Sequence, residues 1–210
     1  MSINAKCKIC RRAGEKLFLK GERCVSPKCA MIKRAYPPGQ KRKRRTSPPS
    51  EYSKELKEKQ KLRNWYNLRE KQFKNYVKIV LEKRGKSEDT SMSLVKLLES
   101  RLDNVVFKLG FAASRVQARQ LVSHGYFLVN GKATNIPSRQ IKKKDTISLK
   151  PQKVKKNITK EIKALIKKQK PPKWLKLNTA KLEGSVIGVP TVEDAALPVE
   201  ISAIFEFYSR

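Results

Sequence analysis

The sequence predicts an α+β protein, on three observations that follow one another along its 210 residues. From Tyr52 to Arg84, apolar side chains recur mostly three and four positions apart, which is typical of amphipathic helices. Two further helices are expected before Gly125, each with its own capping residues. The dipeptide Asn130-Gly131 between short apolar runs then predicts a hairpin, and with it a small antiparallel sheet.

The segment from Tyr52 to Arg84 is expected to form two helices that are broken near Asn67. Asn67 and Glu70 have the spacing of a capping box, in which a side chain at the helix start accepts a backbone N–H three residues further on. Three aromatic residues here could stack on nucleic-acid bases, but their helical spacing favours the core, to which we assign them. They are Trp65, Tyr66 and Phe73.

A longer helix is expected from about Ser91 to Gly110, which suits a C-terminal cap. At 100° per residue its apolar residues fall within an arc of about 80°, and this arc predicts the buried face. They are Leu94, Leu98, Leu102, Val105 and Leu109. Ser114 and Gln117 again have capping-box spacing, so they predict a second, shorter helix that Gly125 closes.

The shorter helix carries a candidate phosphate-binding face. Arg115 and Arg119 lie one turn apart beside its apolar stripe, together with Ser123. Guanidinium groups can bind phosphate oxygens through two parallel hydrogen bonds, so the pair predicts a phosphate clamp. Strands are expected at residues 126–129, 132–134 and 146–149, the last of them after the cationic turn 142–145.

The charge of the chain predicts a polyanionic partner. Lys and Arg number 50 against 18 Asp and Glu, a formal net charge of +32, and self-repulsion of this size destabilises a compact protein. Residues 1–50 hold 15 cations and 2 acids, and five of these cations form an unbroken run. The run is Lys41, Arg42, Lys43, Arg44 and Arg45. Between Glu183 and Tyr208 there are five acids and no cation, which indicates a scaffold or a contact with another protein.

The four cysteines have the spacing of a metal site. Two residues separate Cys7 from Cys10, four separate Cys24 from Cys29, and thirteen lie between the two pairs. Four thiolates in a pair–loop–pair arrangement are typical of structural Zn²⁺, which is the cofactor we expect. An iron–sulfur cluster could use the same ligands, and two disulfides are a third, less expected use in a cytosolic chain.

Several classes of protein are disfavoured. The longest apolar runs are four or five residues, whereas a membrane-spanning helix needs about twenty. No secretory signal is recognised, so we expect a cytoplasmic protein. The single histidine, His124, stands at a predicted helix end, where it can meet a carbonyl or a phosphate. Neither a glycine-rich phosphate loop nor a nucleophile motif is found, so no catalytic residue and no small-molecule substrate are expected.

The middle third resembles a known RNA-binding module. Residues 101–106, 114–125 and 129–132 are similar to the module named after small-subunit ribosomal protein four, which also occurs in some RNA-modifying and tRNA-charging enzymes. Further motifs resemble the bacterial ribosomal protein four family itself, in its zinc-binding four-cysteine form, in the same order along nearly the whole chain. They are 24–31, 36–40, 58–63, 72–76, 172–175 and 206–210. After Gln40 the chain departs from the family's His-Gly, so RNA contacts there are not carried over position by position, and the cations that follow indicate phosphate contact instead.

The resemblance implies a division of the chain into five parts. Residues 1–35 would be a zinc-binding segment, 36–50 a basic proline-rich connector, and 51–99 the first part of a helical domain. Residues 100–163 would form the inserted RNA-binding module of two helices and a small antiparallel sheet. Residues 164–210 would then pack back on the helical domain and complete it.

The resemblance also implies a function and partners. Family members are structural constituents of the small ribosomal subunit that bind the 5′ domain of 16S rRNA at a multi-helix junction and nucleate assembly. They contact ribosomal protein five, at an interface linked to translational accuracy, and protein three, and they lie near the path by which mRNA enters. The residues expected to bind RNA are Arg101, Arg115, Arg119, Gln120, Ser123, His124, Asn130, Lys132 and the run from Lys41 to Arg45.

Two other functions remain open from the sequence. The same module could serve an RNA-modifying enzyme or another RNA-binding protein, although 210 residues leave little room for a catalytic domain. The four cysteines could also belong to a zinc-finger regulator that binds DNA. An enzyme would alter nucleosides in rRNA, and a DNA-binding regulator would be displaced from rRNA by duplex DNA.

Overall fold

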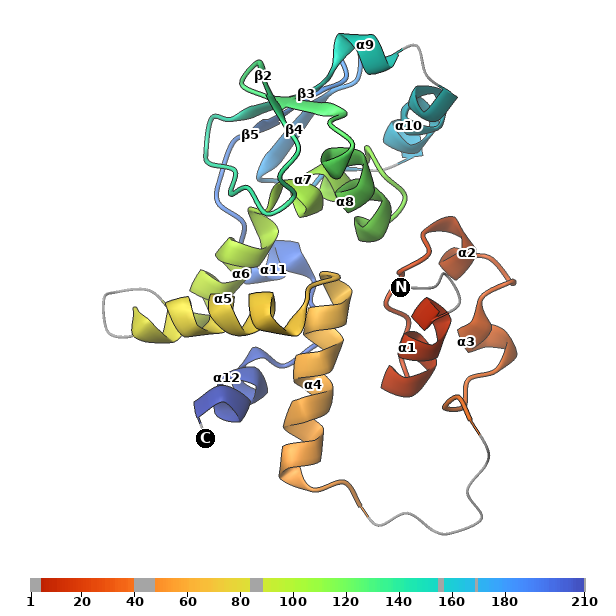
Figure 1. The fold of residues 1–210 in the computed structure, drawn as a ribbon, viewed down its shortest axis with the longest axis vertical. Helices are drawn as coiled ribbons and strands as arrows, with labels where there is room; N and C mark the ends of the chain where they lie inside the picture. The colour runs from red at the N-terminus through yellow and green to blue at the C-terminus, as the bar shows by residue number, and fades with distance from the viewer. Residues whose placement is uncertain (1–4, 40–47, 84–88, 155–156, 169, 210) are drawn as a thin grey trace. The chain divides into compact units, whose positions relative to one another are not determined.

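The structure is a computed structural model that describes residues 5–39, 48–83, 89–154, 157–168 and 170–209. The chain divides into two compact units (Figure 1). The first unit is Met1–Lys83 with Leu197–Arg210, and the second is Arg84–Ala196. In the described part of the chain, no helix has the length and apolar character needed to cross a lipid bilayer.

The N-terminal part of the first unit is built from short helices around a small core. The helices are α1 (Ala5–Ala13), α2 (Glu22–Val25) and α3 (Ala30–Lys33). Cys10, Leu17 and Leu19 form the buried centre, and Trp65 of helix α4 packs against it. Phe18 meets the Trp65 ring edge to face at 6.3 Å between ring centroids, so the cysteine-containing segment is attached to α4 by aromatic contact.

Three longer helices make up the rest of the first unit. They are α4 (Glu51–Trp65), α5 (Glu70–Glu82) and the C-terminal α12 (Ile201–Ser209). Ser50 caps α4 by accepting a hydrogen bond from the Ser53 N–H. Helix α12 packs along α4, so two segments that are far apart in the sequence lie side by side (Figure 1). Tyr66 and Phe73 are buried, which confirms their assignment to the core.

The break near Asn67 is confirmed, but the capping box predicted there is wrong. Asn67 has a positive φ of 54°, a conformation that asparagine tolerates better than most residues, and it ends the turn after α4. The N-cap of α5 is Arg69, which makes no side-chain capping hydrogen bond. Glu70 turns away from the cap because Lys59 and Arg63 of α4 hold its carboxylate.

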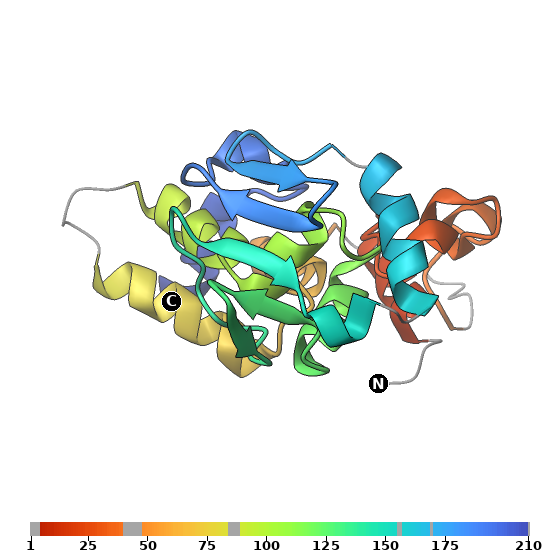
Figure 2. The ribbon, with the colours of Figure 1, turned by 90° about the horizontal axis from the view of Figure 1, so that it is seen from above.

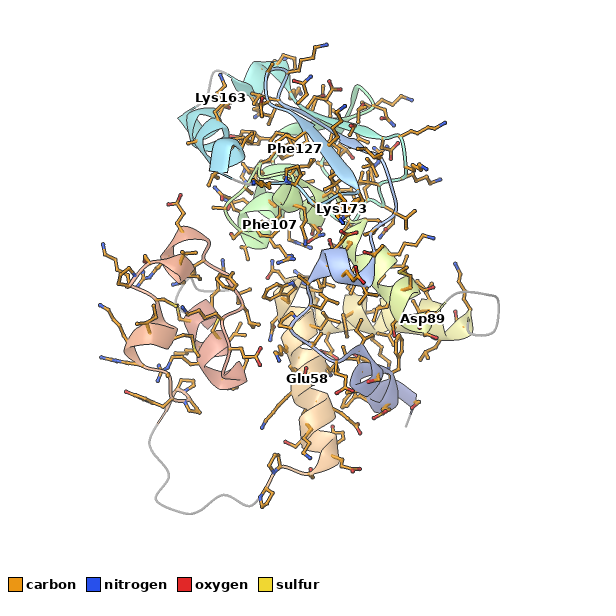
Figure 3. All side chains as sticks on the ribbon, turned by 180° about the vertical axis from the view of Figure 1, so that it is seen from behind. Glu58, Asp89, Phe107, Phe127, Lys163 and Lys173 are labelled. Carbon is orange, nitrogen blue, oxygen red and sulfur yellow. The ribbon has the colours of Figure 1, made fainter. Side chains whose placement is uncertain are left out.

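The second unit begins with three helices, where one long helix and one short helix were predicted. They are α6 (Thr90–Glu99), α7 (Leu102–Lys108) and α8 (Arg115–Ser123). Asp89, labelled in Figure 3, caps α6 through the Ser91 N–H. The chain is extended at Arg101, which forms a β-bridge with Gln140. A prediction from local spacing misses this break, because the break is made by pairing with a segment 39 residues away in the chain.

The sheet of the second unit has five antiparallel strands in the order β2-β1-β3-β5-β4, as the view from above shows (Figure 2). The strands are β1 (Phe127–Val129), β2 (Lys132–Thr134), β3 (Thr146–Leu149), β4 (Leu175–Asn178) and β5 (Glu183–Val186). Asn130 and Gly131 take the positive φ values, 51° and 75°, that the hairpin between β1 and β2 requires. The hairpin and β3 are confirmed, whereas β4 and β5 were not predicted.

Helices α7 and α8 cover one face of this sheet (Figures 1 and 2). Phe127 of β1, labelled in Figure 3, is fully buried and meets Phe111 at 5.5 Å between ring centroids. The remaining helices are α9 (Pro151–Val154), α10 (Asn157–Lys168) and α11 (Val192–Ala195). Ile162 and Ile166 of α10 and Trp174 before β4 complete the core.

The division into units differs from the predicted segments. Helix α6 was expected in the helical domain with residues 51–99, but it belongs to the second unit. Residues 164–210 were expected to pack together on the helical domain. In the structure β4, β5 and α11 belong to the second unit, while α12 belongs to the first.

Candidate nucleic-acid interface

Helix α8, which carries the predicted phosphate-binding face, is capped at its start by side chains. Ser114 accepts a hydrogen bond from the Gln117 N–H at 3.3 Å, and the Gln117 side-chain oxygen accepts one from the Ala113 N–H at 2.8 Å. These bonds satisfy backbone donors that a helix start leaves free. Near the other end of α8, Gln120, Ser123 and His124 are exposed, as the sequence predicts for RNA ligands.

Arg119 is partly exposed and shares a carboxylate with Arg101. The Asp103 carboxylate accepts hydrogen bonds from the Arg101 Nε at 3.0 Å and from the Arg101 Nη2 at 2.7 Å. The Arg119 Nη1 lies 3.3 Å from Asp103 Oδ2, and 35% of the Arg119 side chain is exposed. Two guanidinium groups meet one carboxylate, so the cluster of Arg101, Asp103 and Arg119 keeps a net positive charge. Its partly exposed member is Arg119 on α8.

Arg115 takes part in a second interior network. Its Nε donates to the Asn104 side-chain oxygen at 2.8 Å, and its guanidinium lies 4.7 Å from the centroid of the Phe107 ring, which Figure 3 labels. The Asn104 amide donates to a Glu99 carboxylate oxygen at 2.9 Å. Burial lowers the pKa of Lys108, which lies beside Glu99 and Arg115.

The structure therefore corrects the expected position of two predicted RNA ligands. Arg115 is 8% exposed, so it does not lie on an exposed face as the helical spacing suggested, and Arg101, which was expected to bind RNA beside the module, is fully buried. Their guanidinium groups are held by carboxylate and amide oxygens from α7. In this arrangement they fix Arg119 and the α7–α8 pair from within, and their contact with RNA stays a prediction that would need these bonds to open.

The hairpin between β1 and β2 adds two exposed residues, and beside it lies a turn of exposed lysines that was not among the predicted ligands. Asn130 and Lys132 are exposed, as expected. The Asn130 amide group donates to Asp145 Oδ1 at 2.7 Å and its oxygen accepts from the Thr146 N–H at 2.8 Å. Asn130 thus joins the hairpin turn to the cationic turn before β3, where three exposed lysines stand. These are Lys142, Lys143 and Lys144, whose signal in the sequence was the run of three cations itself.

The first unit carries cations around its N-terminal helices. Lys8 and Arg12 on α1 are exposed, and so are Lys33 and Arg34 at the end of α3. The predicted ligands Lys41, Arg42, Lys43, Arg44 and Arg45 lie outside the described residues. The exposed lysines and arginines around these helices can bind phosphate groups, because phosphate binding depends more on positive charge than on a fixed shape.

The four cysteines line one small pocket of the first unit. Lys6, Leu19, Lys20, Ala30 and Met31 complete its wall. All four thiols are free, and the Lys20 N–H points to the Cys24 sulfur at 3.3 Å. Burial raises the pKa of Cys10, and the nearness of Cys24, Cys7 and Cys29 raises it further.

The donor set fits a soft metal ion, although the thiols are not arranged as a coordination shell. Among the residues that the structure describes, no group of three or more His, Cys, Asp or Glu side chains is placed to hold a metal ion. What the chain offers is four sulfur donors at the wall of one pocket, without a histidine or a carboxylate among the lining residues. A set of sulfur donors suits Zn²⁺ or an iron–sulfur cluster and excludes oxygen-preferring ions such as Mg²⁺ and Ca²⁺.

Comparison with known proteins matches both halves of the chain. Residues 2–99 match the family described as ribosomal protein S4/S9 N-terminal domain, and residues 100–147 match the S4 domain. The small ribosomal subunit protein uS4 of Halothermothrix orenii is 48% identical over 204 residues, which cover 97% of this chain and 96% of the relative. That of Thermus thermophilus is 45% identical over 208 residues, which cover 99% and 98%.

A third relative agrees with these two. The small ribosomal subunit protein uS4 of Syntrophomonas wolfei is 46% identical over 204 residues, which cover 97% of this chain and 96% of the relative. Each of these three similarities covers at least 97% of this chain. The chain is therefore a member of the ribosomal protein uS4 family.

Proposed function

We propose that this protein is a structural constituent of the small ribosomal subunit and binds the 5′ domain of 16S rRNA directly, at a junction of several helices. The observation that carries the proposal is the match to small-subunit proteins over at least 96% of both chains. The net charge of +32 supports it, because rRNA phosphates supply the counter-charge that the free protein lacks.

RNA recognition would be mainly electrostatic and by shape. Exposed residues of α8 and of the two turns beside the sheet offer donors to phosphate oxygens and 2′-hydroxyls. Each phosphate contact releases counterions, so affinity should fall steeply as the salt concentration rises. Arg119, Gln120, Ser123, His124 and Lys132 are the contacts we propose on the described surface of the second unit.

The family also suggests a place in the cell and protein neighbours. We place the protein in the cytoplasm, within the small ribosomal subunit, where it would help nucleate assembly. Contacts with ribosomal protein five, linked to translational accuracy, and with protein three are proposed on the same ground. The family is one of ribosomal structural proteins, so the protein is not an enzyme.

We further propose that the four cysteines bind one structural Zn²⁺. Support comes from their paired spacing, from their common pocket and from the small core around Cys10, which buries few apolar side chains. Zinc bound to four thiolates contributes folding free energy on the order of 10 kcal/mol in small modules. The metal would fix α1, α2 and α3 against one another.

Metal content of the purified protein tests the zinc proposal. We expect one Zn²⁺ per chain by atomic absorption, and its loss in Cys24→Ser together with faster proteolysis of residues 5–35. Visible absorption typical of iron and sulfide would favour a cluster instead. A chain that carries no metal, and whose proteolysis a chelator leaves unchanged, would contradict a metal site of either kind.

Nuclease footprinting on small-subunit rRNA tests the main proposal. We expect protection confined to the 5′ domain, and little loss of binding when duplex DNA or heparin competes at moderate salt. Mass spectrometry of the recovered rRNA should show unaltered nucleosides. Equal displacement by every polyanion would show a nonspecific cation surface, and altered nucleosides would show an enzyme.

A further inference from the structure

We propose that Tyr36 is a stacking site for one unpaired RNA base, a role that deepens and rests on the proposed rRNA binding. Tyr36 follows helix α3 and precedes Pro37 and Pro38 in the first unit. The residue is 46% exposed. Proteins that bind unpaired nucleotides stack the bases on exposed aromatic rings, because every base has an apolar face to cover.

The position of Tyr36 is fixed by Arg11 of α1. The Arg11 Nε donates to the Tyr36 carbonyl oxygen at 2.9 Å, and its Nη2 donates to the Pro37 carbonyl oxygen at 3.4 Å. The same guanidinium lies 4.9 Å from the centroid of the Tyr36 ring. One side chain therefore holds both the backbone and the ring, and the prolines that follow restrict the backbone further. Little conformational entropy remains to be lost when a base stacks there.

Other exposed aromatic residues of the first unit do not combine these features. Tyr52 is 52% exposed, but its ring lies on Phe207 of α12, with centroids 5.5 Å apart and planes at 31°. That contact explains Tyr52 as part of the α4–α12 packing. Phe18 is 41% exposed and meets Trp65, so it belongs to the small N-terminal core. The Tyr36 ring meets the Arg11 guanidinium, and sites that bind unpaired nucleotides combine aromatic rings with arginine in this way.

The charge around Tyr36 selects RNA over an apolar protein segment as the occupant. Lys33 and Arg34 precede it and are exposed, and no Asp or Glu occurs from Arg23 to Ser50. The phosphates on either side of a stacked base would meet these cations. A protein segment docking here would instead need acidic residues to match the same charge.

RNA binding by Tyr36→Leu and Tyr36→Phe distinguishes stacking on an aromatic ring from contact with any large apolar side chain. Tyr36→Leu should weaken binding to the 5′-domain RNA by about tenfold, whereas Tyr36→Phe should bind within about twofold of the original protein. Tyr52→Leu is the matched control, because it removes an equally exposed tyrosine of the same unit that stacks within the protein, and it should leave RNA affinity unchanged. Melting curves of all variants check that each remains folded.

The salt dependence distinguishes a stacked base from a lost phosphate contact. Tyr36→Leu should leave the slope of log affinity against log salt unchanged, because no counterion-releasing contact is removed. The double variant Lys33→Gln, Arg34→Gln should reduce that slope. Wild-type affinity for Tyr36→Leu would overturn the stacking site, and so would a weaker affinity accompanied by a smaller slope.

A fluorescence measurement covers the case in which Tyr36→Leu unfolds the segment. Tyr36→Trp keeps an aromatic ring, and its emission should be quenched when a base stacks on it, beyond the change seen in the original protein with Trp65 and Trp174. Absence of this extra quenching on binding would overturn the proposal. If the original protein itself shows no preference for the 5′ domain, the proposed function fails, a result distinct from failure of the stacking site.

Discussion

At the scale of single residues, Asp103 forms ion pairs with two arginines of the second unit. Its carboxylate pairs with the fully buried Arg101 and also meets Arg119 of α8. Removing one partner of a buried ion pair leaves an uncompensated charge in the interior. Asp103→Asn should therefore lower the free energy of unfolding of the second unit by about 3 kcal/mol or more.

Urea denaturation, followed by Trp174 fluorescence in a Trp65→Phe background, measures this change. Glu82→Gln supplies the control, since its ion pair with Lys78 is 3.6 Å long and exposed on both sides. Because Glu82 belongs to the first unit, its effect is followed by Trp65 fluorescence in a Trp174→Phe background. Pairs of that kind contribute less than about 1 kcal/mol. If Asp103→Asn costs no more than the control, the Arg101 charge finds its compensation elsewhere.

The same contact changes what Arg119 can reveal. If Arg119 contacted only phosphate, Arg119→Glu would weaken RNA binding and leave melting nearly unchanged. In the structure that substitution would place a second carboxylate next to Asp103, so repulsion would lower stability as well. Arg119→Gln avoids the repulsion, because it removes the charge while retaining a hydrogen-bond donor for Asp103.

At the scale of secondary-structure elements, Glu70 ties the C-terminal helix to α4 and α5. Its carboxylate accepts from Lys59 at 2.6 Å, from Arg63 at 2.9 Å and from the Tyr208 hydroxyl at 3.0 Å. The Lys59 ammonium also lies 4.4 Å from the centroid of the Phe207 ring. Burial alone would raise the pKa of Glu70, but these hydrogen bonds together lower it.

The lowered pKa predicts a loss of stability in acid. Because the folded-state pKa of Glu70 lies below the ordinary value, which is about 4.3, its contribution is present above that pH. The contribution disappears as the pH falls through the folded-state value. Glu70→Gln should lower the stability of the first unit by roughly 1 kcal/mol at pH 7, a small effect because the carboxylate is partly exposed to solvent.

Melting of the first unit at several pH values checks this prediction. The difference between the original protein and Glu70→Gln should shrink as the pH falls below about 4. A constant difference from pH 7 to pH 3 would show that Glu70 acts through packing and not through its charge.

In alkali, burial and then the Glu70 hydrogen bond raise the pKa of Tyr208, so its neutral hydroxyl should persist above pH 10.

The close approach of strand β5 to α7 depends on a glycine. A Cβ added at Gly184 would lie 2.4 Å from Leu109 Cδ1 and 2.8 Å from its Cδ2. Leu109 is fully buried at the end of α7, so its side chain has little room to move. Gly184→Ala should therefore destabilise the second unit by about 1–3 kcal/mol through overpacking.

A double-mutant cycle tests the cause. Leu109→Val shortens the side chain that the new Cβ would meet. The cost of Gly184→Ala should be smaller in the Leu109→Val background than in the original one, in denaturation of the second unit. Additive costs would indicate that the strand, and not the Leu109 contact, is what the alanine disturbs.

Elements whose signals lie close together in the sequence are the ones that could be predicted. The Ser114 cap and the Asn130-Gly131 turn act over three or four residues, and the structure confirms both. The break at Arg101 and the addition of β4 and β5 to the sheet arise from pairing with distant strands and loops. Local spacing contains no information on such pairing, because tertiary contacts decide it.

The candidate interface divides in the same way. The exposure of Gln120, His124 and Lys132 could be predicted, because these residues lie at the end of a helix and in a hairpin. Arg115 was assigned to a phosphate-binding face from its helical spacing with Arg119, and Arg101 was expected beside it. Their partners, Asp103 and Asn104, are close in sequence, but nothing in the spacing shows that these side chains turn inward to meet them.

At the scale of the whole molecule, the excess of positive charge opposes a compact state. The chain has 50 cations and 18 acids, and several of the acids are committed to internal pairs. Asp103, Glu70 and Glu99 each meet cations within their own unit. Many exposed lysines and arginines are therefore left to repel one another in the free protein.

This repulsion predicts that salt stabilises the free protein before it weakens RNA binding. Raising NaCl from about 10 mM to about 100 mM shortens the screening length from about 30 Å to about 10 Å, which weakens repulsion across each unit. Calorimetry in a series of NaCl concentrations should show both unfolding transitions rising by several degrees. NaF at equal ionic strength is the control, because equal shifts with either anion identify screening, whereas unequal shifts identify binding of a particular ion. Transitions that fall with added salt would mean that the internal ion pairs, and not the net charge of +32, dominate the electrostatics of the free protein.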